Sequence, residues 1–249
     1  MSVFKDYTVD YDECFNSDLS RTKIAREIAQ RLKKSYKNIC DTFKTFKNAL
    51  IYSQFVQFLS DNQIKLPEFL IDTWKEIHTS KKKAYIGRHQ FLELIVACEG
   101  NGLMVLPAID KIDLDSEESW KKELSKEITD VIFTLHKPIL EFAYTRFINE
   151  KNLEGFCEFI EQSEIKVKNI DYCYYMSINT KSDDHHTMNY TEFLAALCRI
   201  ASNANSELPF IKNLEMLMPA VQKVCPKRVQ DIFKFPTPEL YIKTMYTIL

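Results

Sequence analysis

The chain resembles itself at a nearly constant interval. Shifted by 101 residues, FKNALIYSQFVQFLSDNQI at 46–64 lies over FINEKNLEGFCEFIEQSEI at 147–165, and at 102 residues IGRHQFLELI at 86–95 lies over MNYTEFLAAL at 188–197. Two matching blocks in the same order in each half predict a duplicated supersecondary unit. The alternative is that amphipathic helices of an apolar-rich chain share a few phenylalanines by chance.

The composition favours helices. Glycine occurs at Gly87, Gly100, Gly102 and Gly155 among 249 residues, which disfavours tight hairpins and a glycine-rich phosphate loop. A hydrophobic content of 45% with 27% charged residues is typical of a globular chain. We therefore predict an all-α fold.

The periodicity predicts five segments. Residues 1–17 lack helical periodicity and are predicted to form an extended N-terminal arm, before a helix capped by Asp18 or Ser20. Glycines, Pro107 and acids break the pattern after residue 98, and a second long helix is predicted from Ser116. The predicted units are the arm, a first lobe at 18–98, an interlobe linker at 99–119, a second lobe with its entry helix at 120–203, and a C-terminal helical extension at 204–249.

Charge and cysteine usage exclude several classes of protein. No apolar run reaches the ~18 residues of a membrane span, and aspartates stand where a signal peptide would be apolar, so we expect a cytoplasmic protein that does not contact membrane. The net charge of −2 gives no indication of nucleic acid as a partner. Seven cysteines without zinc-ligand spacing are predicted to be reduced thiols.

Each half carries two segments in which an apolar residue precedes Gln or Glu by four positions and Phe by five. The N-terminal half has Leu50-Gln54-Phe55 and Ile86-Gln90-Phe91; the C-terminal half has Met188-Glu192-Phe193 and a divergent Lys151-Gly155-Phe156. This form resembles the outgoing half of EF-hands. The separations of Leu50 from Ile86 and of Lys151 from Met188 match the pairing of adjacent loops through one backbone bridge. The resemblance implies lobe cores built on Phe55, Phe58, Phe91, Phe156, Phe159 and Phe193.

Most loop positions have lost the ligands that calcium needs. An EF-hand loop places mostly carboxylate oxygens at positions 1, 3, 5 and 12. The first loop offers Phe43, Thr45 and Lys47, the second Thr79, Lys81 and Lys83, and the third Tyr144, Arg146 and Ile148. We therefore expect no metal and no cofactor in these loops. Asn48 and Asn149 are predicted to keep the left-handed turn that glycine normally provides.

The fourth loop is the nearest to a calcium loop. Asp183, Asp184 and Glu192 are the weak candidate ligands, although Lys181 falls at the first position. A transition metal bound by the aspartates with His185 and His186 is an alternative, since imidazole and carboxylate suit zinc or nickel. Adjacent loop residues rarely converge on one ion, which favours a solvated polar loop.

No recognisable catalytic motif is present, so we expect a protein that is not an enzyme. The ending FLAALCRIA at 193–201 resembles calcium-free EF-hand pairs of ciliary and flagellar axonemal proteins. That resemblance implies a structural or adaptor role on microtubules, with tubulin or other axonemal proteins as partners and the cytoskeleton of the cilium as its location. Alternatives are a light-chain-like module that binds an amphipathic helix, and a weak calcium sensor. Two groups of residues are predicted to bind partners. The basic side chains of one helix are Arg26, Lys33, Lys34 and Lys37, for which the alternative is a face that simply contacts solvent. The apolar side chains near the C-terminus are Tyr241 and Met245.

Overall fold

A computed structural model describes residues 4, 11–21, 26–78, 84–112, 122, 124, 126–178 and 187–232, without the side chains of 26, 27, 231 and 232. Apart from one isolated backbone bridge, the regular secondary structure of this part of the chain is helical, as predicted. The α-helices are α1 (Tyr11–Ser20), α2 (Arg26–Thr45), α3 (Tyr52–Asp61), α4 (Leu70–Ile77), α5 (Arg88–Gly100), α6 (Leu106–Ile109), α8 (Glu127–Leu135), α9 (Lys137–Ala143), α10 (Leu153–Ser163), α11 (Ile170–Tyr175), α12 (Tyr190–Ala204), α13 (Phe210–Lys223) and α14 (Lys227–Ile232), and a π-helix, η3 (Tyr144–Ile148), continues α9.

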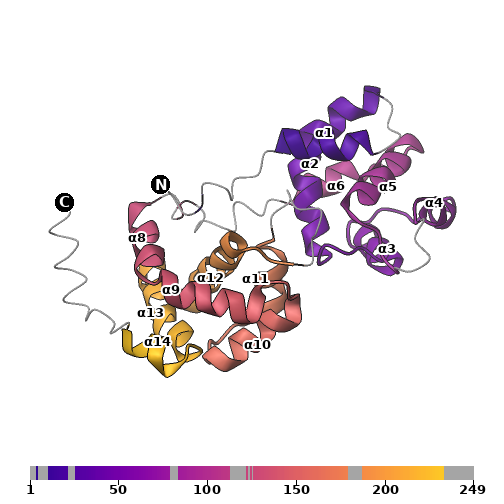
Figure 1. Cartoon of the computed structure of the whole chain (residues 1–249). Helices are drawn as coiled ribbons and strands as arrows, with labels where there is room; N and C mark the ends of the chain where they lie inside the picture. The colour runs from indigo at the N-terminus through magenta and orange to yellow at the C-terminus, as the bar shows by residue number, and fades with distance from the viewer. Residues whose placement is uncertain are drawn as a thin grey trace.

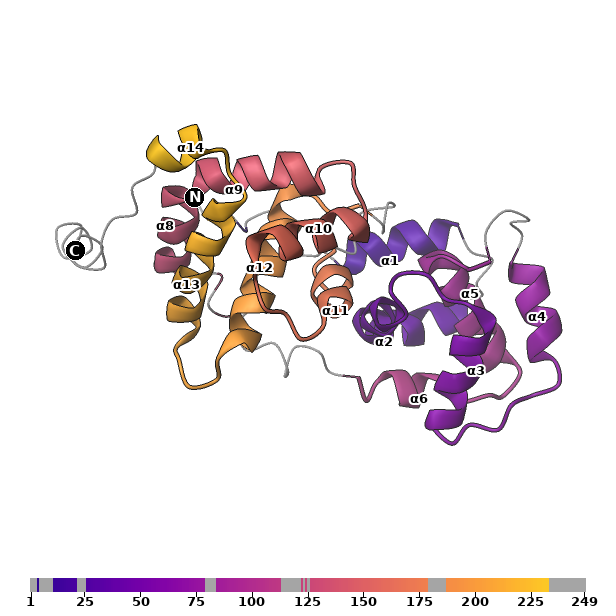
Figure 2. The ribbon, with the colours of Figure 1, turned by 90° about the horizontal axis from the view of Figure 1, so that it is seen from below.

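The helices gather into two bodies, each around its own cluster of buried hydrophobic side chains (Figures 1 and 2). We call them the N-terminal lobe (residues 11–112) and the C-terminal lobe (residues 124–232). The phenylalanines predicted as lobe cores divide between them. Phe55, Phe91, Phe156, Phe159 and Phe193 are 0% exposed, whereas Phe58 is partly buried and packs edge-on against Phe46.

The first segment differs from the predicted extended arm. Residues 11–20 form α1, which packs on α2 and α5 and buries Cys14 and Phe15 in the N-terminal cluster. Asp18 is 2% exposed in the interior of that helix, so it does not cap the next one. Tyr11, Cys14, Phe15 and Asp18 follow the i, i+3, i+4, i+7 spacing of a helical face, a pattern that the acids between them obscure.

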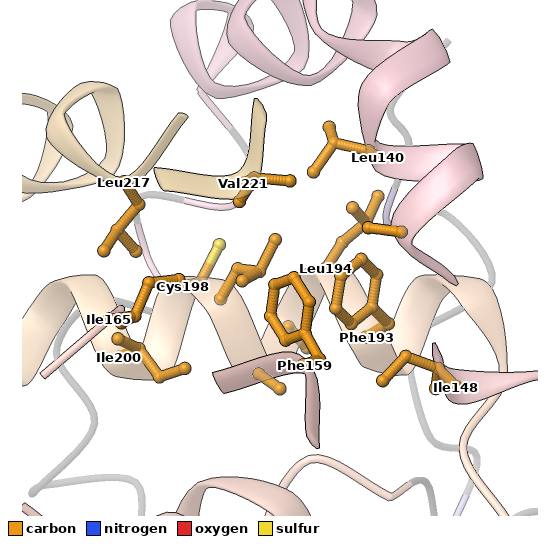
Figure 3. Close-up of a cluster of buried hydrophobic side chains, with 14 of the residues drawn as sticks. Leu140, Ile148, Phe159, Ile165, Phe193, Leu194, Cys198, Ile200, Leu217 and Val221 are labelled. Atoms are coloured by element: carbon orange, nitrogen blue, oxygen red, sulfur yellow. The ribbon is translucent and has the colours of Figure 1, made fainter. Parts of the chain in front are cut away.

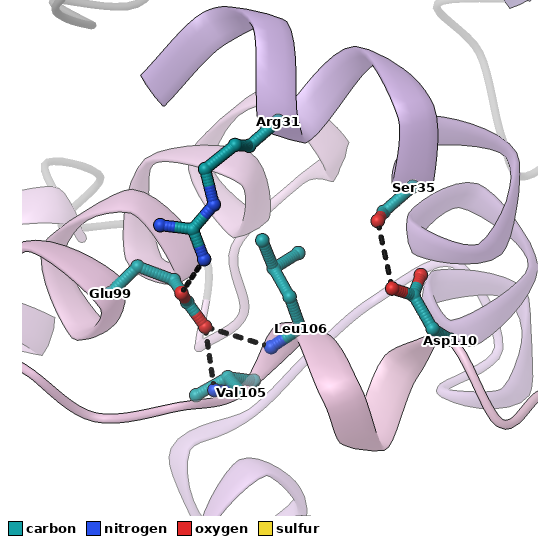
Figure 4. A network of polar contacts seen from close by, with 6 residues as sticks. All are labelled: Arg31, Ser35, Glu99, Val105, Leu106 and Asp110. Carbon is teal, nitrogen blue, oxygen red and sulfur yellow. Dashed lines mark hydrogen bonds and ion pairs between the residues drawn. The ribbon is translucent and has the colours of Figure 1, made fainter. Parts of the chain in front are cut away.

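The predicted linker also differs, because its first part completes the N-terminal lobe. Val105, Leu106 and Ile109 are buried in that cluster. The carboxylate of Glu99 accepts hydrogen bonds from the N–H groups of Val105 (2.7 Å) and Leu106 (2.9 Å) and pairs with Arg31 of α2 (Figure 4). The start of α6 is thereby capped and held on α2. Its end is held by Asp110, which accepts from Ser35 Oγ at 3.0 Å.

The predicted entry helix of the C-terminal lobe is interrupted at Lys126. Lys126 has an extended backbone (φ −81°, ψ 137°), and α8 starts at Glu127, whereas the predicted start at Ser116 lies outside the described residues. Helix α8 ends at Leu135, and α9 starts immediately after His136. Pro138 lacks the N–H that a continuous helix would need at that point.

Helix α13 is part of this lobe and not a separate extension. It packs against α8, α9, α10 and α12, and its apolar face joins their cluster (Figure 3). Leu214, Met218 and Val221 are 0% exposed, beside Leu140, Phe159 and Leu194. At ~25 cal/mol per Å² of buried apolar surface, each of these side chains contributes roughly 1.5–3 kcal/mol. The rest of the predicted extension, 233–249, lies outside the described residues.

The lobes meet where helix α2 approaches α11, and Lys47 just beyond α2 pairs with Asp171. Phe4 precedes the N-terminal lobe in the sequence but packs in the C-terminal cluster, edge-on against Phe133 of α8 with ring centroids 5.6 Å apart. Among the helices that the structure describes, none combines the length and apolar character that a bilayer crossing requires.

Candidate functional site

Three helices begin with the same capping arrangement. A side chain at the third helical position accepts a hydrogen bond from the backbone N–H of the residue before the helix, which satisfies a donor that the helix leaves open. The residues at this position are those predicted as the last loop ligand. The three bonds join Ile51 N to Gln54 Oε1 (3.0 Å), Gly87 N to Gln90 Oε1 (3.0 Å) and Asn189 N to Glu192 Oε2 (2.8 Å).

The structure joins Leu50 to Ile86 through an antiparallel backbone bridge. The N–H of Leu50 donates to the carbonyl of Ile86 at 3.3 Å, and the N–H of Ile86 donates back at 2.9 Å. Both side chains are 0% exposed. Gln90 adds a bond from Nε2 to the carbonyl of Ile77 at 2.8 Å. The N-terminal lobe therefore has the loop pairing that the sequence predicts for it.

The corresponding pair of the C-terminal lobe is not joined in this way. Lys151 donates its N–H to Ile148 at 2.9 Å, and the carbonyl of Met188 accepts from the Tyr144 hydroxyl at 3.3 Å. The predicted bridge from Lys151 to Met188 is therefore wrong, and a side-chain contact takes its place. The physical reason is that residues of η3 take the groups a bridge would use: Ile148 at its end accepts from Lys151, and Tyr144 at its start donates to Met188.

Gly155 occupies the position that holds Gln or Glu in the other three helix starts. A Cβ atom there would lie 2.1 Å from the carbonyl oxygen of Phe147 and 2.8 Å from Cβ of Lys151. No larger side chain fits against the end of η3, so the start of α10 is capped by Asn152, which accepts from Glu154 N at 3.0 Å. The presence of glycine in place of Gln or Glu at this helix start thus has a steric cause.

The first and third loops are short. Residues 46–51 separate α2 from α3, and 149–152 separate η3 from α10, so most of the predicted ligand positions lie inside helices. Lys47 and Asn48 adopt the left-handed conformation (φ 59° and 55°). In the third loop Glu150 does so (φ 59°), whereas Asn149 has φ −55°, contrary to the prediction for Asn149. Neither gap leaves space for a twelve-residue calcium loop.

Lys47 is engaged by the other lobe. Its ammonium group pairs with the Asp171 carboxylate, and this hydrogen bond raises the pKa of Lys47. Both side chains are about half exposed, so solvent screens the pair. A loop position that would hold a calcium ligand in an EF-hand therefore carries a cation that contacts a neighbouring helix.

Of the predicted metal candidates, the structure describes Glu192 alone. Glu192 is 1% exposed, and its carboxylate caps α12, as described above. Asp183, Asp184, His185 and His186 lie outside the described residues, as do Thr79, Lys81, Lys83 and Lys181. Within the part that the structure describes, no three His, Cys, Asp or Glu side chains are grouped to hold a metal ion.

The predicted basic stripe on α2 is partly neutralised by the chain itself. Lys33 Nζ lies 3.1 Å from a carboxylate oxygen of Asp12 in α1, and Lys37 Nζ lies 3.3 Å from one of Asp41. Lys34 is exposed. The Arg26 side chain, Tyr241 and Met245 lie outside what the structure describes. The pairing with Asp12 could not be foreseen without α1.

A buried ion pair that sequence reasoning missed joins α1 to α5. Arg88 contacts both carboxylate oxygens of Asp18, at 2.7 and 3.2 Å, and the Tyr36 hydroxyl donates to the same carboxylate at 2.6 Å. Burial, together with the adjacent carboxylate, raises the pKa of Tyr36 far above its usual value, and burial raises the pKa of Cys40 to about 12. Tyr36 and Cys40 therefore stay protonated at neutral pH. The contacts of Asp18 with Arg88 and Tyr36 join α1 to α5 and α2.

A cavity of about 360 Å³ opens in the C-terminal lobe between the segment before α11 and the second half of α12. Three of its lining residues are cationic: Lys166, Lys168 and Arg199. None of the ten described lining residues is acidic, although the whole chain has a net charge of −2. The cavity lining is Lys166, Val167, Lys168, Asn169, Tyr172, Cys173, Arg199, Ile200, Ser202 and Asn203.

Comparison with known proteins adds no relative: no family model, no curated protein and no solved structure matches this chain.

Proposed function

We propose that this chain is a non-enzymatic structural or adaptor protein whose two lobes derive from a duplicated pair of EF-hand-like units and bind other proteins without calcium. The arrangement of caps and the Leu50–Ile86 bridge support the EF-hand-like origin. By the resemblance in its sequence, the protein is a component of the ciliary axoneme that contacts tubulin or a neighbouring axonemal protein.

The main support for the proposal is that helices of the chain itself cover the apolar faces of both lobes. In a light-chain-like or sensor module, an apolar groove stays open for a target helix. Here α13 covers the apolar face formed by α9, α10 and α12, and α1 covers the face formed by α2 and α5. Covered faces suit a protein held in one conformation, which binds partners through its outer surface. They disfavour the light-chain-like alternative.

The side chains at the loop positions support calcium independence. The residues at the helix starts are used as caps, and Lys47 adds positive charge where an ion would lie. A hard cation needs 6–8 oxygen ligands, which short loops with cationic side chains do not offer.

Co-sedimentation with microtubules tests the proposed partner. The protein is expected to pellet with taxol-stabilised microtubules or isolated axonemal doublets equally in calcium and in a calcium chelator. Failure to pellet with intact doublets would refute the cytoskeletal role.

Calorimetric titration tests the loops separately. We expect no heat of calcium binding at sub-millimolar concentration. A binding isotherm in that range, lost on mutation of Asp183 and Asp184 to Asn, would show a working fourth loop and favour the calcium-sensor alternative.

A further inference from the structure

The basic cavity of the C-terminal lobe has the chemistry of a recognition site. Lys166 and Lys168 are exposed and lie two residues apart on the segment that precedes α11. Between and beside them, Ile165 is buried and Val167 packs on the core, so the inward and outward side chains alternate. In such an alternating segment both lysines lie on one face, roughly 7 Å apart.

Two described acids that flank this segment in the sequence are engaged elsewhere. Glu164 pairs with Lys223, and Asp171 pairs with Lys47. Within the described part of the chain, neither Lys166 nor Lys168 forms an ion pair. Arg199, 1% exposed, adds a third positive charge in the wall and donates to Ser177 Oγ. A concave site lined by one sign of charge concentrates ligands of the opposite sign.

The neutral groups of the cavity suit a peptide. Asn169 uses its amide oxygen to accept from Tyr172 N (3.0 Å), which leaves its NH₂ group as a donor. Asn203 uses its NH₂ group on the carbonyl of Arg199 (3.0 Å), which leaves its oxygen as an acceptor. A peptide backbone needs one of each, whereas a simple oxyanion can use donors only. A volume of about 360 Å³ lies within the range of ligand pockets.

We propose that this cavity binds an extended acidic peptide segment, with alternate carboxylates on Lys166 and Lys168 and its backbone on Asn169 and Asn203. The inference rests on the proposed function, since it names the chemistry of the partner. Alternate side chains of an extended peptide have the same spacing as the two lysines. Arg199 lends positive charge to the wall and remains bonded to Ser177.

The N-terminal lobe offers a natural control, because the site is not repeated there. Continuing the 101-residue shift past its matched block places Lys65 over Lys166, and Pro67 and Glu68 over Lys168 and Asn169; continuing the 102-residue shift places Ala97 over Arg199. Lys65 is exposed, so its reversal to Glu changes the charge of the protein by the same amount as Lys166→Glu.

The test is fluorescence anisotropy of the full chain with a labelled peptide of alternating Glu and Ser. Lys166→Glu and Lys168→Glu are each expected to weaken binding by about tenfold, equivalent to about 1.4 kcal/mol, and Lys65→Glu by less than about twofold. Circular dichroism melting curves confirm that each variant is folded. Absence of binding by the wild type, or equal weakening by Lys65→Glu, would overturn the proposal. Equal affinity for inorganic phosphate would overturn the peptide assignment.

Parallel co-sedimentation with microtubules separates the two proposals. If the wild type pellets and the Lys166→Glu/Lys168→Glu double variant pellets equally, the cavity is not the contact, and the cytoskeletal role stands. If the wild type does not pellet but binds the peptide, the cavity assignment stands and the cytoskeletal role fails.

Discussion

Removing Arg88 should destabilise the N-terminal lobe selectively. In Arg88→Met, the Asp18 carboxylate, which is 2% exposed in the wild type, keeps only the Tyr36 hydroxyl from the three-residue network. Breaking a buried pair by removal of one partner costs about 3–5 kcal/mol, because the other charge is left uncompensated. For a lobe of this size, that loss corresponds to a fall in Tm of about 12 °C or more.

The two tryptophans allow the lobes to be followed separately. In a Trp120→Phe background, Trp74, which is buried in the N-terminal cluster, becomes the only reporter. In Arg88→Met, the midpoint temperature of the Trp74 fluorescence transition should fall, while the midpoint of the calorimetric transition of the C-terminal lobe should not change.

An apolar replacement of the whole network is the matched control. The Asp18→Leu/Tyr36→Phe/Arg88→Met variant should recover most of the lost stability, because no buried polar group is left without a partner. A loss below about 1 kcal/mol in Arg88→Met would refute the reasoning, since it is the size expected of a solvent-screened pair. So would an equal shift of both transitions, because the lobes would then unfold as one unit.

Three further predictions concern single positions. Gly155→Ala should destabilise the C-terminal lobe by about 2 kcal/mol or more in denaturant titrations, because the new Cβ would overlap the Phe147 carbonyl. Gly100→Ala is the matched control: no atom lies within 4 Å of a new Cβ there, so this change should be neutral or slightly stabilising. Gln90→Ala should cost about 0.5–2 kcal/mol of the stability of the N-terminal lobe, as loss of a helix cap does, and no change in its melting curve would contradict the cap. Burial, opposed in part by the Glu215 carboxylate, lowers the pKa of His136 to about 4, so the folded state favours the neutral ring. The free energy of unfolding is then at its full value above the unfolded pKa of about 6.5 and falls as the pH drops from there toward 4. The expected loss is about 2 kcal/mol after allowance for screening. Urea titrations from pH 4 to 7.5 should show this slope for the wild type and a flatter one for His136→Gln; parallel slopes would contradict it.

The sequence predicted the helical class and located the segments that lead into α3, α5 and α12, because these depend on local patterns, although it assigned Gln54, Gln90 and Glu192 to the last loop-ligand position and not to helix caps. An apolar residue followed at fixed spacing by Gln or Glu and by Phe places a cap and a core side chain in one short segment. It also placed Leu50 and Ile86 at a separation that allows them to pair. These features need only the order of residues along a short stretch.

The errors arose where tertiary contacts decide the structure. The acids of α1 suggest a solvated arm until Arg88, seventy positions away, supplies the partner for Asp18. Residues 99–112 suggest a linker because their helix is one turn long and depends on the Glu99 carboxylate and on Ser35 for its ends. The missing bridge at Lys151 follows from η3, and π-helices leave no periodic signal in a sequence of this length.

The position of α13 has a consequence for how the chain acquires its structure during synthesis. The N-terminal lobe has all of its parts once residue 112 has left the ribosome, so it can close first. The C-terminal lobe must wait for residues 210–225, and until then the apolar faces of α9, α10 and α12 are exposed to other nascent chains. Phe4 precedes α8 in the sequence by more than a hundred residues, so it can reach its place on Phe133 only long after it has itself been synthesised.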